Sequence, residues 1–248
     1  MIKAENISKS FQGTNVLNDV SATFKKGQNN LIIGQSGSGK TVMMKCIVGL
    51  LEVDKGNIFY DDRNFNKMSF KQRKELRREI GMLFQGGALF DSMNVEENVM
   101  FPLTMFTKWT YKERQDRVNF CLERVNLNNV NHLYPDELSG GMQKRVAIAR
   151  AISMNPKYLF CDEPNSGLDP RTSVMIDDLI DELTRDFEMT TIINTHDMNS
   201  VLSMGDQILF INKGEIAWKG SKDEILTTNN KTINDFVYVT EMAKRLKG

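Results

Sequence analysis

The sequence predicts an α/β fold with a mostly parallel sheet that helices cover on both faces. Two short apolar runs, residues 31–33 and 158–161, have the character of buried strands. A glycine-rich turn follows the first run, and an acidic pair follows the second. Strand-like and helix-like segments alternate along most of the chain. Because a helix between two strands returns the chain to the same end of a sheet, this alternation favours parallel pairing.

The N-terminal part predicts a separate set of antiparallel strands. Residues 2–24 alternate between apolar and polar side chains, with turn signals at Gln12-Gly13 and Lys26-Gly27. This is the pattern of paired strands with one solvated face. Residues 41–48 have helical character and end at Gly49, a typical helix C-cap. Residues 57–60 are typical of an edge strand.

The remainder of the chain is predicted to be mostly helical from 85 to 154 and mixed thereafter. The expected elements are a helix at 111–125, a strand at 158–161, a helix at 174–187, a strand at 190–194 and a hairpin of 207–212 with 215–219. Apolar residues recur at helical spacing from 236 to 246. They predict an amphipathic tail helix that packs on its own domain or on a partner copy. No Pro/Gly-rich linker interrupts the chain, so we expect one compact body.

Composition excludes several functional classes. Lys and Arg together number 32, as do Asp and Glu, so the net charge is zero and no global field attracts nucleic acid. The locally basic segment 71–78, which Ser69 and Gln72 can open with a capping box, is more typical of a solvated helix face than of a polyanion site. No stretch approaches the roughly 20 apolar residues of a membrane span. We expect a cytoplasmic protein without an export signal, and another chain must supply any part within a bilayer.

The cysteines predict neither a metal site nor a disulfide. Cys46, Cys121 and Cys161 are far apart in the sequence and form no CxxC pair. Free cysteines behave as small apolar residues, so we expect three buried thiols in a reducing compartment.

One motif predicts phosphate binding. It fits the pattern G-x-x-x-x-G-K-[ST], lies between an expected strand and an expected helix, and consists of Gly34, Gln35, Ser36, Gly37, Ser38, Gly39, Lys40 and Thr41. Glycines let successive backbone N–H groups surround phosphate oxygens, and the helix that follows directs its positive end to the same charge. We expect Lys40 to contact the β- and γ-phosphates and Thr41 to offer its hydroxyl to Mg²⁺. The alternative is a flexible Gly/Ser turn.

Three polar residues at strand ends extend this site. Asp162 ends the 158–161 strand and is expected to hold Mg²⁺, while Glu163 is expected to act on the attacking water. In isolation, such a pair is more often a solvated strand end. His196 follows the 190–194 strand and can face the γ-phosphate. The second histidine, His132, is expected to be an ordinary core or surface residue.

Residues 138–145, Leu-Ser-Gly-Gly-Met-Gln-Lys-Arg, closely resemble the LSGGQ signature of ABC (ATP-binding cassette) ATPases. With the phosphate loop and Asp162-Glu163-Pro164, the resemblance covers nearly the whole chain. It implies that Phe11 stacks on adenine, with a strand-core aromatic as the alternative. It further implies that Gln85 is the glutamine-loop residue near Mg²⁺, Asp169 the D-loop residue and His196 the switch histidine. Met142 replaces the usual signature glutamine and Gly167 the more common D-loop alanine, which could alter dimer packing.

The resemblance implies a P-loop NTPase fold of the ABC type, with a mostly parallel core sheet, an antiparallel β subdomain and a helical subdomain. The implied organisation is a single ABC ATPase domain over 1–248. Its core and β subdomain would comprise 1–84 and 155–228, its helical subdomain about 85–154, and its tail helix about 234–247. It also implies a head-to-tail homodimer that holds two ATP molecules, in which Ser139, Gly140 and Gly141 of one copy face the Lys40 loop of the other.

A narrower resemblance concerns the cargo. Residues 81–103, with Gly-Ala-Leu-Phe at 87–90, and the Met142 variant resemble the ATPase of Mla-type phospholipid transporters. This implies a membrane permease, an MCE-domain lipid-binding protein, and a location on the inner face of the cell membrane. Leu89, Phe90 and Met93 are expected either to form a groove for a permease helix or to pack within the helical lobe.

Other functions share these motifs. An amino-acid or other small-solute importer uses the same catalytic residues, and a soluble ABC protein for iron–sulfur assembly is a further alternative. DNA-maintenance relatives usually carry a long coiled-coil insertion, for which this chain has no room. A P-loop kinase would not explain the Ser139 signature or Gln85.

Overall fold

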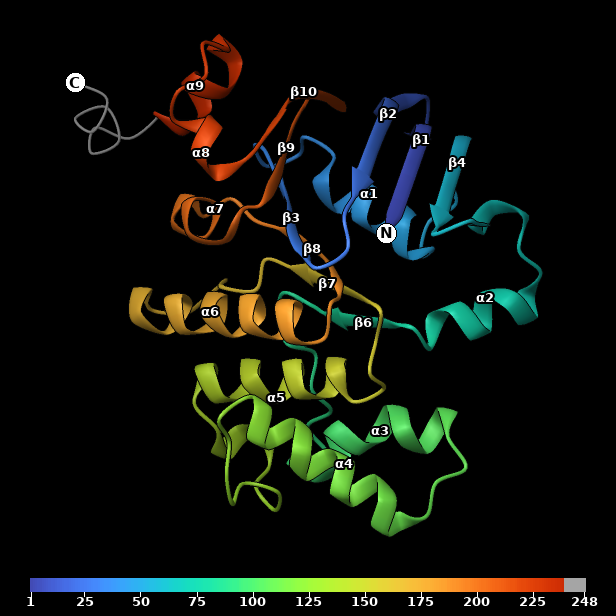
Figure 1. The fold of residues 1–248 in the computed structure, drawn as a ribbon, viewed down its shortest axis with the longest axis vertical. Helices are drawn as coiled ribbons and strands as arrows, with labels where there is room; N and C mark the ends of the chain where they lie inside the picture. Colours follow the sequence, from blue (N-terminus) through green and yellow to red (C-terminus); the bar gives the residue numbers. More distant parts are fainter. Residues whose placement is uncertain (239–248) are drawn as a thin grey trace. The chain divides into compact units, whose positions relative to one another are not determined.

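The computed structural model describes residues 1–238, and the chain divides into two compact units (Figure 1). The first unit comprises Met1–Met68 and the residues that follow Thr191, and the second comprises Ser69–Thr191. Each unit contains both strands and helices. Strand β8 (Thr190–Asn194) runs from the second unit into the first.

The first unit contains the expected antiparallel strands. Their order in the sheet is β2-β1-β4-β5, in which β1 pairs antiparallel with both β2 and β4. The strands are β1 (Ile2–Phe11), β2 (Thr14–Phe24), β4 (Lys55–Tyr60) and β5 (Arg63–Asn64). The expectation that residues 57–60 form an edge strand was wrong. A turn at Asp61, whose φ is 51°, returns the chain so that β5 pairs with β4 and takes the outer position.

A second group of strands in the first unit has the buried, apolar character of a parallel sheet. Strand β3 (Gln28–Ile33) pairs parallel with β9 (Gln207–Asn212), which pairs antiparallel with β10 (Glu215–Gly220) as the predicted hairpin. On the other side of β3, the Thr195 N–H donates to the Ile32 carbonyl at 3.2 Å, directly after β8 ends. Strands β3 and β8 therefore end at the same edge, where the phosphate loop begins.

Helices of the first unit follow these strands. They are α1 (Lys40–Val48), α7 (Met198–Met204), α8 (Lys222–Ile225) and α9 (Lys231–Val237), with a short 3₁₀ turn at Phe65–Lys67. Gly49 ends α1 as predicted: its φ is 80°, and its N–H donates to the carbonyls of Lys45 and Cys46. The predicted tail helix at 234–247 lies largely outside the described residues.

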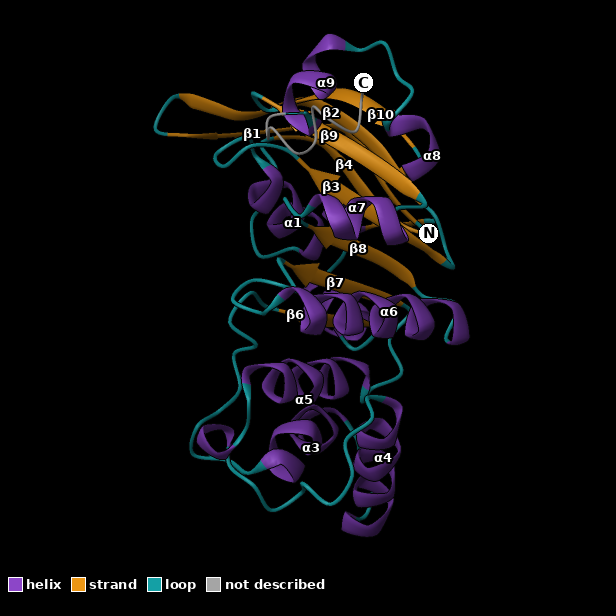
Figure 2. Ribbon diagram, turned by 90° about the vertical axis from the view of Figure 1, so that its left-hand side faces the viewer, coloured by secondary structure: helices purple, strands orange, loops and turns teal. Residues whose placement is uncertain are grey.

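The second unit is mostly helical around one parallel strand pair (Figure 2). The strands are β6 (Ile80–Leu83) and β7 (Tyr158–Asp162). The helices are α2 (Phe70–Arg77), α3 (Val95–Phe106), α4 (Tyr111–Arg124), α5 (Gly140–Ile152) and α6 (Pro170–Asp186), with a 3₁₀ turn at Pro135–Glu137. Three of the helices begin with capping boxes, in which a side chain and the backbone satisfy each other's hydrogen bonds. The boxes pair Ser69 with Gln72, Asn94 with Glu97, and Thr110 with Glu113.

Helix α6 begins earlier than residue 174, the start that the sequence predicts. The Asp169 carboxylate accepts hydrogen bonds from the N–H groups of Arg171 and Thr172 at 3.0 and 3.1 Å. Pro170 occupies the first helical position, where its missing N–H has no cost. The apolar spacing of this helix becomes regular only after these polar first residues, which is why periodicity located its start too late.

Burial of the three thiols agrees with the expectation. Cys46, Cys121 and Cys161 are buried and free. Burial raises the pKa of the Cys46 and Cys121 thiols to about 11 and also raises the pKa of Cys161. In the described part of the chain, no helix is long and apolar enough to cross a membrane.

We predict that the folded protein resists alkylation at pH 8. A thiol whose pKa lies near 11 is almost entirely protonated at this pH, and the thiolate is the reactive form. Mass spectrometry after iodoacetamide treatment should show unmodified Cys46, Cys121 and Cys161 in the folded protein and full modification in urea. Rapid labelling of any of the three without urea would contradict their described burial.

Candidate functional site

The phosphate loop connects β3 to α1, and close packing determines where its glycines must lie. A Cβ atom on Gly34 would lie 2.2 Å from the Ile211 carbonyl oxygen, a distance that no side chain tolerates. Gly39 has a φ of 111°, which strongly favours glycine. The turn of the β9–β10 hairpin is hydrogen-bonded to the loop, since the Gly214 N–H donates to the Ser38 carbonyl at 3.0 Å. The loop therefore rests against backbone on one side and opens on the other.

The open side fits a phosphate group. Helix α1 begins at Lys40 after the N-cap residue Gly39, which has no side chain that could accept a hydrogen bond from the first turn. The Ser38 hydroxyl is buried and has no hydrogen-bond partner in the described structure. Lys40 is 9% exposed, and its ammonium donates to the carbonyls of Gly34 and Gln35 at 2.8 and 3.1 Å. Phosphate oxygens would satisfy the hydroxyl and the N–H groups and would bring a compensating charge to the ammonium.

Two further predicted residues lie in the first unit. Phe11 ends β1 and is 41% exposed, so it is not part of the strand core. The Lys9 ammonium lies 5.5 Å from the centre of its ring. His196 is exposed and comes directly after Thr195, at the edge where β3 also ends. An exposed aromatic suits stacking on a base, and the histidine shares the phosphate loop's edge of the sheet.

The second unit brings the glutamine and the acidic pair to one edge of its strands. Strands β6 and β7 run parallel, with Leu83 opposite Cys161, so Gln85, Asp162 and Glu163 all follow at the same end. Glu163 has a φ of 50°, which is uncommon for a non-glycine residue and occurs where surroundings hold the backbone. The Gln85 amide donates to the Ser166 hydroxyl at 3.1 Å. The glutamine is thus tied to the loop that follows Glu163.

A buried pair behind this loop holds it in place. The Asn165 amide donates to the Asp177 carboxylate at 2.8 Å, and the two residues are only 9% and 4% exposed. A buried carboxylate requires such a partner. Sequence reasoning missed this pair. The only available signal was Asp177 in the otherwise apolar face of α6.

The signature residues begin α5. Ser139 is the N-cap, and its hydroxyl accepts from the Met142 N–H at 3.3 Å. A hydroxyl that accepts one hydrogen bond still has its own proton to donate. Gly141 must be small, because a Cβ there would lie 2.7 Å from a methyl group of Thr172. Thr172 also donates to Asp169 at 2.5 Å, and this bond lowers the pKa of the Asp169 carboxyl.

Two cations of α5 hold the glutamine loop, and sequence reasoning missed both. The Lys144 ammonium donates to the Gln85 carbonyl. The Arg150 guanidinium donates to the carbonyls of Gly87 and Ala88, and both of these Arg150 hydrogen bonds are 2.8 Å long. Burial lowers the pKa values of both cations. Their signal was a cation within the otherwise buried, apolar face of α5. The signature helix and the glutamine loop are therefore fastened together.

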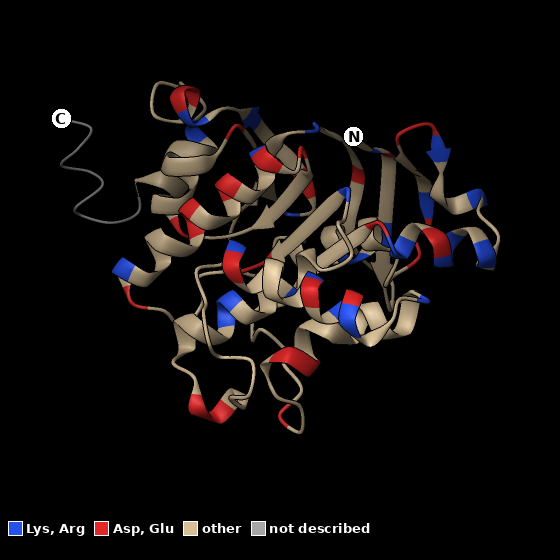
Figure 3. Ribbon diagram, turned by 60° about the horizontal axis from the view of Figure 1, so that its bottom comes forward, with Lys and Arg blue, Asp and Glu red and all other residues tan. Residues whose placement is uncertain are grey.

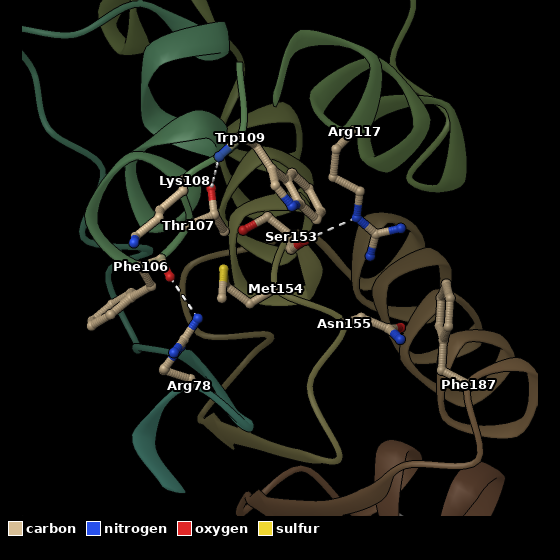
Figure 4. Close-up of a pocket in the computed structure, with 10 residues that line it drawn as sticks. All are labelled: Arg78, Phe106, Thr107, Lys108, Trp109, Arg117, Ser153, Met154, Asn155 and Phe187. Carbon is tan, nitrogen blue, oxygen red and sulfur yellow. Dashed lines mark hydrogen bonds between the residues drawn. The ribbon is translucent and has the colours of Figure 1, made fainter. Parts of the chain in front are cut away.

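A groove of about 970 Å³ lies elsewhere in the second unit (Figure 4). Aromatic and cationic side chains dominate its walls. The lining residues are Arg78, Phe106, Thr107, Lys108, Trp109, Arg117, Ser153, Met154, Asn155 and Phe187. Arg78 donates to the Phe106 carbonyl at 2.6 Å, and Arg117 donates to the Ser153 carbonyl at 2.9 Å. Leu89, Phe90 and Met93, which were expected either to form a groove for a permease helix or to pack within the helical lobe, do not line it. The Phe90 ring instead packs 4.8 Å from that of Phe101.

The predicted site residues thus form two groups. The first unit holds Phe11, Gly34, Gln35, Ser36, Gly37, Ser38, Gly39, Lys40, Thr41 and His196. The second unit holds Gln85, Ser139, Gly140, Gly141, Asp162, Glu163 and Asp169. The first group suits nucleotide binding, and the second suits water activation and anion contact at the start of a helix. His132 is exposed on the surface.

Comparison with known proteins gives consistent relatives. The chain is 39% identical to the methionine import ATP-binding protein MetN of Campylobacter jejuni, over 96% of this chain and 75% of the relative. It is 34% identical to the probable ribonucleotide transport ATP-binding protein mkl of Mycobacterium tuberculosis, over 95% of this chain and 66% of the relative. Part of each relative's length therefore has no counterpart in this chain.

Solved structures show the same fold. The dimeric post-hydrolysis structure of the ATP-binding cassette MJ0796 with ADP and Pi has a TM-score of 0.81 and 31% identity, over 90% of this chain and 99% of that one. The structure of cbiO1 from Clostridium perfringens, part of the ABC transporter complex cbiONQ, has a TM-score of 0.86 and 28% identity, over 100% and 98%. A family model described as ABC transporter matches residues 17–166, more than half of the chain. The chain therefore belongs to the ABC transporter family, as an ATP-binding subunit that hydrolyses ATP with Mg²⁺.

Proposed function

We propose that this chain is the motor of a membrane transporter that moves phospholipid between membranes, working as a head-to-tail dimer. The main support for a dimer is that the residues suited to contact phosphate lie in two different units of the chain. Helix α1 begins at Lys40 after a glycine N-cap in the first unit, while α5 presents Ser139 and Gly141 in the second. Two copies arranged head to tail would let each loop use the signature of the other copy.

Within one copy, the residues divide the work as follows. The loop N–H groups, Ser38 and Lys40 bind the phosphates. Thr41 and Asp162 would hold Mg²⁺, which neutralises charge on the phosphate oxygens. Glu163 would orient the attacking water and accept its proton, with His196 and Gln85 contacting the γ-phosphate and the metal's water shell.

Dimer closure would complete the site. The Ser139 hydroxyl of the partner subunit and the first N–H groups of its α5 suit the γ-phosphate, because a helix N-terminus stabilises negative charge. One copy alone would hold ATP but lack these donors. Hydrolysis would then depend on closure, which allows another protein to control it.

The groove of the second unit suits the permease. It combines the aromatic residues Phe106, Trp109 and Phe187 with three cations, Arg78, Lys108 and Arg117. Aromatic residues and arginine are enriched in protein interfaces. We therefore propose that a short cytoplasmic helix of the permease, with acidic residues at one end, binds here.

Phospholipid is the proposed cargo because residues 81–103 and Met142 resemble the Mla-type ATPase. An MCE-domain lipid-binding protein would then belong to the assembly. Amino-acid import is the second candidate. It is favoured by the 39% and 40% identity to the methionine import proteins of Campylobacter jejuni and Mannheimia succiniciproducens.

We predict that Glu163→Gln binds ATP with unchanged affinity but hydrolyses it about a hundredfold more slowly or worse, because the water loses its proton acceptor. Calorimetry and steady-state phosphate release measure the two effects. The control is Glu123→Gln, which removes an exposed carboxylate on α4. Wild-type turnover in Glu163→Gln would remove this residue from the mechanism.

A mixing experiment tests whether the site is shared. Lys40→Ala and Ser139→Arg should each abolish hydrolysis alone. In a mixed dimer, the intact loop of one copy would meet the intact signature of the other, so mixing should restore up to one working site per dimer. If each site lay within a single chain, every site would retain a defect and mixing would restore nothing.

Purification in detergent tests the groove and the cargo together. We predict that a permease co-purifies with the wild-type chain and is lost from Trp109→Asp, because a carboxylate would enter a groove that favours acidic partners. The control is Tyr134→Asp, since Tyr134 is 43% exposed, as Trp109 is 45% exposed, but lies outside the groove. A co-purifying MCE-domain protein supports phospholipid, a methionine permease supports import, and a soluble iron–sulfur scaffold contradicts both.

A further inference from the structure

Helix α2 carries one aromatic side chain and several cations on a single face. Residues three, four, seven or eight positions apart lie on one side of a helix. By this spacing, Phe70 shares its side with Lys74, Arg77, the C-cap residue Arg78 and the partly buried Arg73, and Lys71 lies beside them. Leu76 points the opposite way and is fully buried. We call the five residues Phe70, Lys71, Lys74, Arg77 and Arg78 the outer face of α2.

The outer face is exposed although the helix is well anchored. Phe70 is 79% exposed, the highest value among the large apolar residues of the described chain. The helix begins with a complete capping box at Ser69. Its C-terminal end is fixed where Arg78 donates to the Phe106 carbonyl at 2.6 Å. A phenyl ring on an anchored helix remains in water at a cost that an apolar environment would remove.

The charge of this face is almost entirely positive. Lys71, Lys74 and Arg77 are exposed and form no ion pair with any residue from 1 to 238. The single carboxylate of the helix, Glu75, pairs with Arg78 at 3.0 Å. In Figure 3, in which Lys and Arg positions are blue, several blue segments lie along α2 toward the right. Since the whole chain has no net charge, this concentration is local.

We propose that the outer face of α2 binds the anionic headgroups of a lipid bilayer, with Phe70 inserted at the interface. Cations attract an anionic surface, and an aromatic ring among them enters the headgroup region. A soluble polyanion would contact the cations but would leave the phenyl ring in water. The combination therefore favours a lipid surface.

The position of α2 agrees with this occupant. Arg78 is the C-cap residue of α2 and also lines the proposed permease groove, where it donates to the Phe106 carbonyl. A permease helix in that groove would place α2 beside the bilayer. Only this argument from position rests on the proposed function, because the chain would bind to vesicles without a permease.

The experiment measures sedimentation of the full chain with vesicles of phosphatidylcholine alone or mixed with phosphatidylglycerol. We expect binding only to the mixed vesicles, decreasing as salt rises. Lys71→Glu/Lys74→Glu/Arg77→Glu should weaken it by at least about tenfold. Phe70→Ser should weaken binding while leaving its salt dependence in place.

The matched control reverses three exposed lysines elsewhere in Lys25→Glu/Lys55→Glu/Lys231→Glu, and it should bind as the wild type does. ATP hydrolysis should be unchanged in both triple variants, which verifies folding. Equal binding to both kinds of vesicle, or equal loss in the two triple variants, would overturn the proposal. It would also be overturned if vesicles fail to bind and the α2 variant instead loses a co-purifying acidic protein. Loss of the permease from Trp109→Asp, by contrast, concerns only the groove.

Discussion

Helix α1 begins after Gly39, an N-cap residue without a side chain, and this feature shapes the phosphate loop around it. The helix start lies beside the Ser38 hydroxyl, which is buried and has no hydrogen-bond partner among the described residues, so an acceptor from a bound phosphate would satisfy it. The backbone of the loop packs closely against β9, and a side chain at Gly34 would collide with the Ile211 carbonyl oxygen. Lys40 then adds a cation that would be costly to bury without an anion.

Within the second unit, hydrogen bonds join the signature helix to the glutamine loop, and Gln85 to the loop after Glu163. Lys144 and Arg150 project from the helix that Ser139 begins, and both hold carbonyls of the glutamine loop. Gln85 in turn donates to Ser166, which follows the acidic pair Asp162-Glu163. A movement of α5 would therefore change the position of Gln85 as well as that of the signature. Hydrogen bonds of buried cations are strong enough to keep these elements together.

The sequence predicted well those features that depend on neighbouring residues. The phosphate loop, the Ser69 capping box, the Gly49 cap and strand β8 follow from local patterns, and the structure has them. Features that depend on packing between distant segments escaped prediction. β4 is an inner strand because β5 pairs with it, and the groove joins residues from 78 to 187. The hydrogen-bond partners of Arg150 and Asp177 could not be predicted either, because the partner of a buried side chain depends on the tertiary fold.

Ala88 adopts a left-handed conformation, with a φ of 50°, where Arg150 holds its carbonyl. For alanine this conformation costs roughly 1–2 kcal/mol, which glycine would not incur. The hydrogen bonds from Arg150 to the Gly87 and Ala88 carbonyls therefore hold a backbone conformation that Ala88 would not adopt by itself. Strain at this residue and the cation that opposes it thus belong to one device, and the conformation of the glutamine loop depends on a side chain of the signature helix.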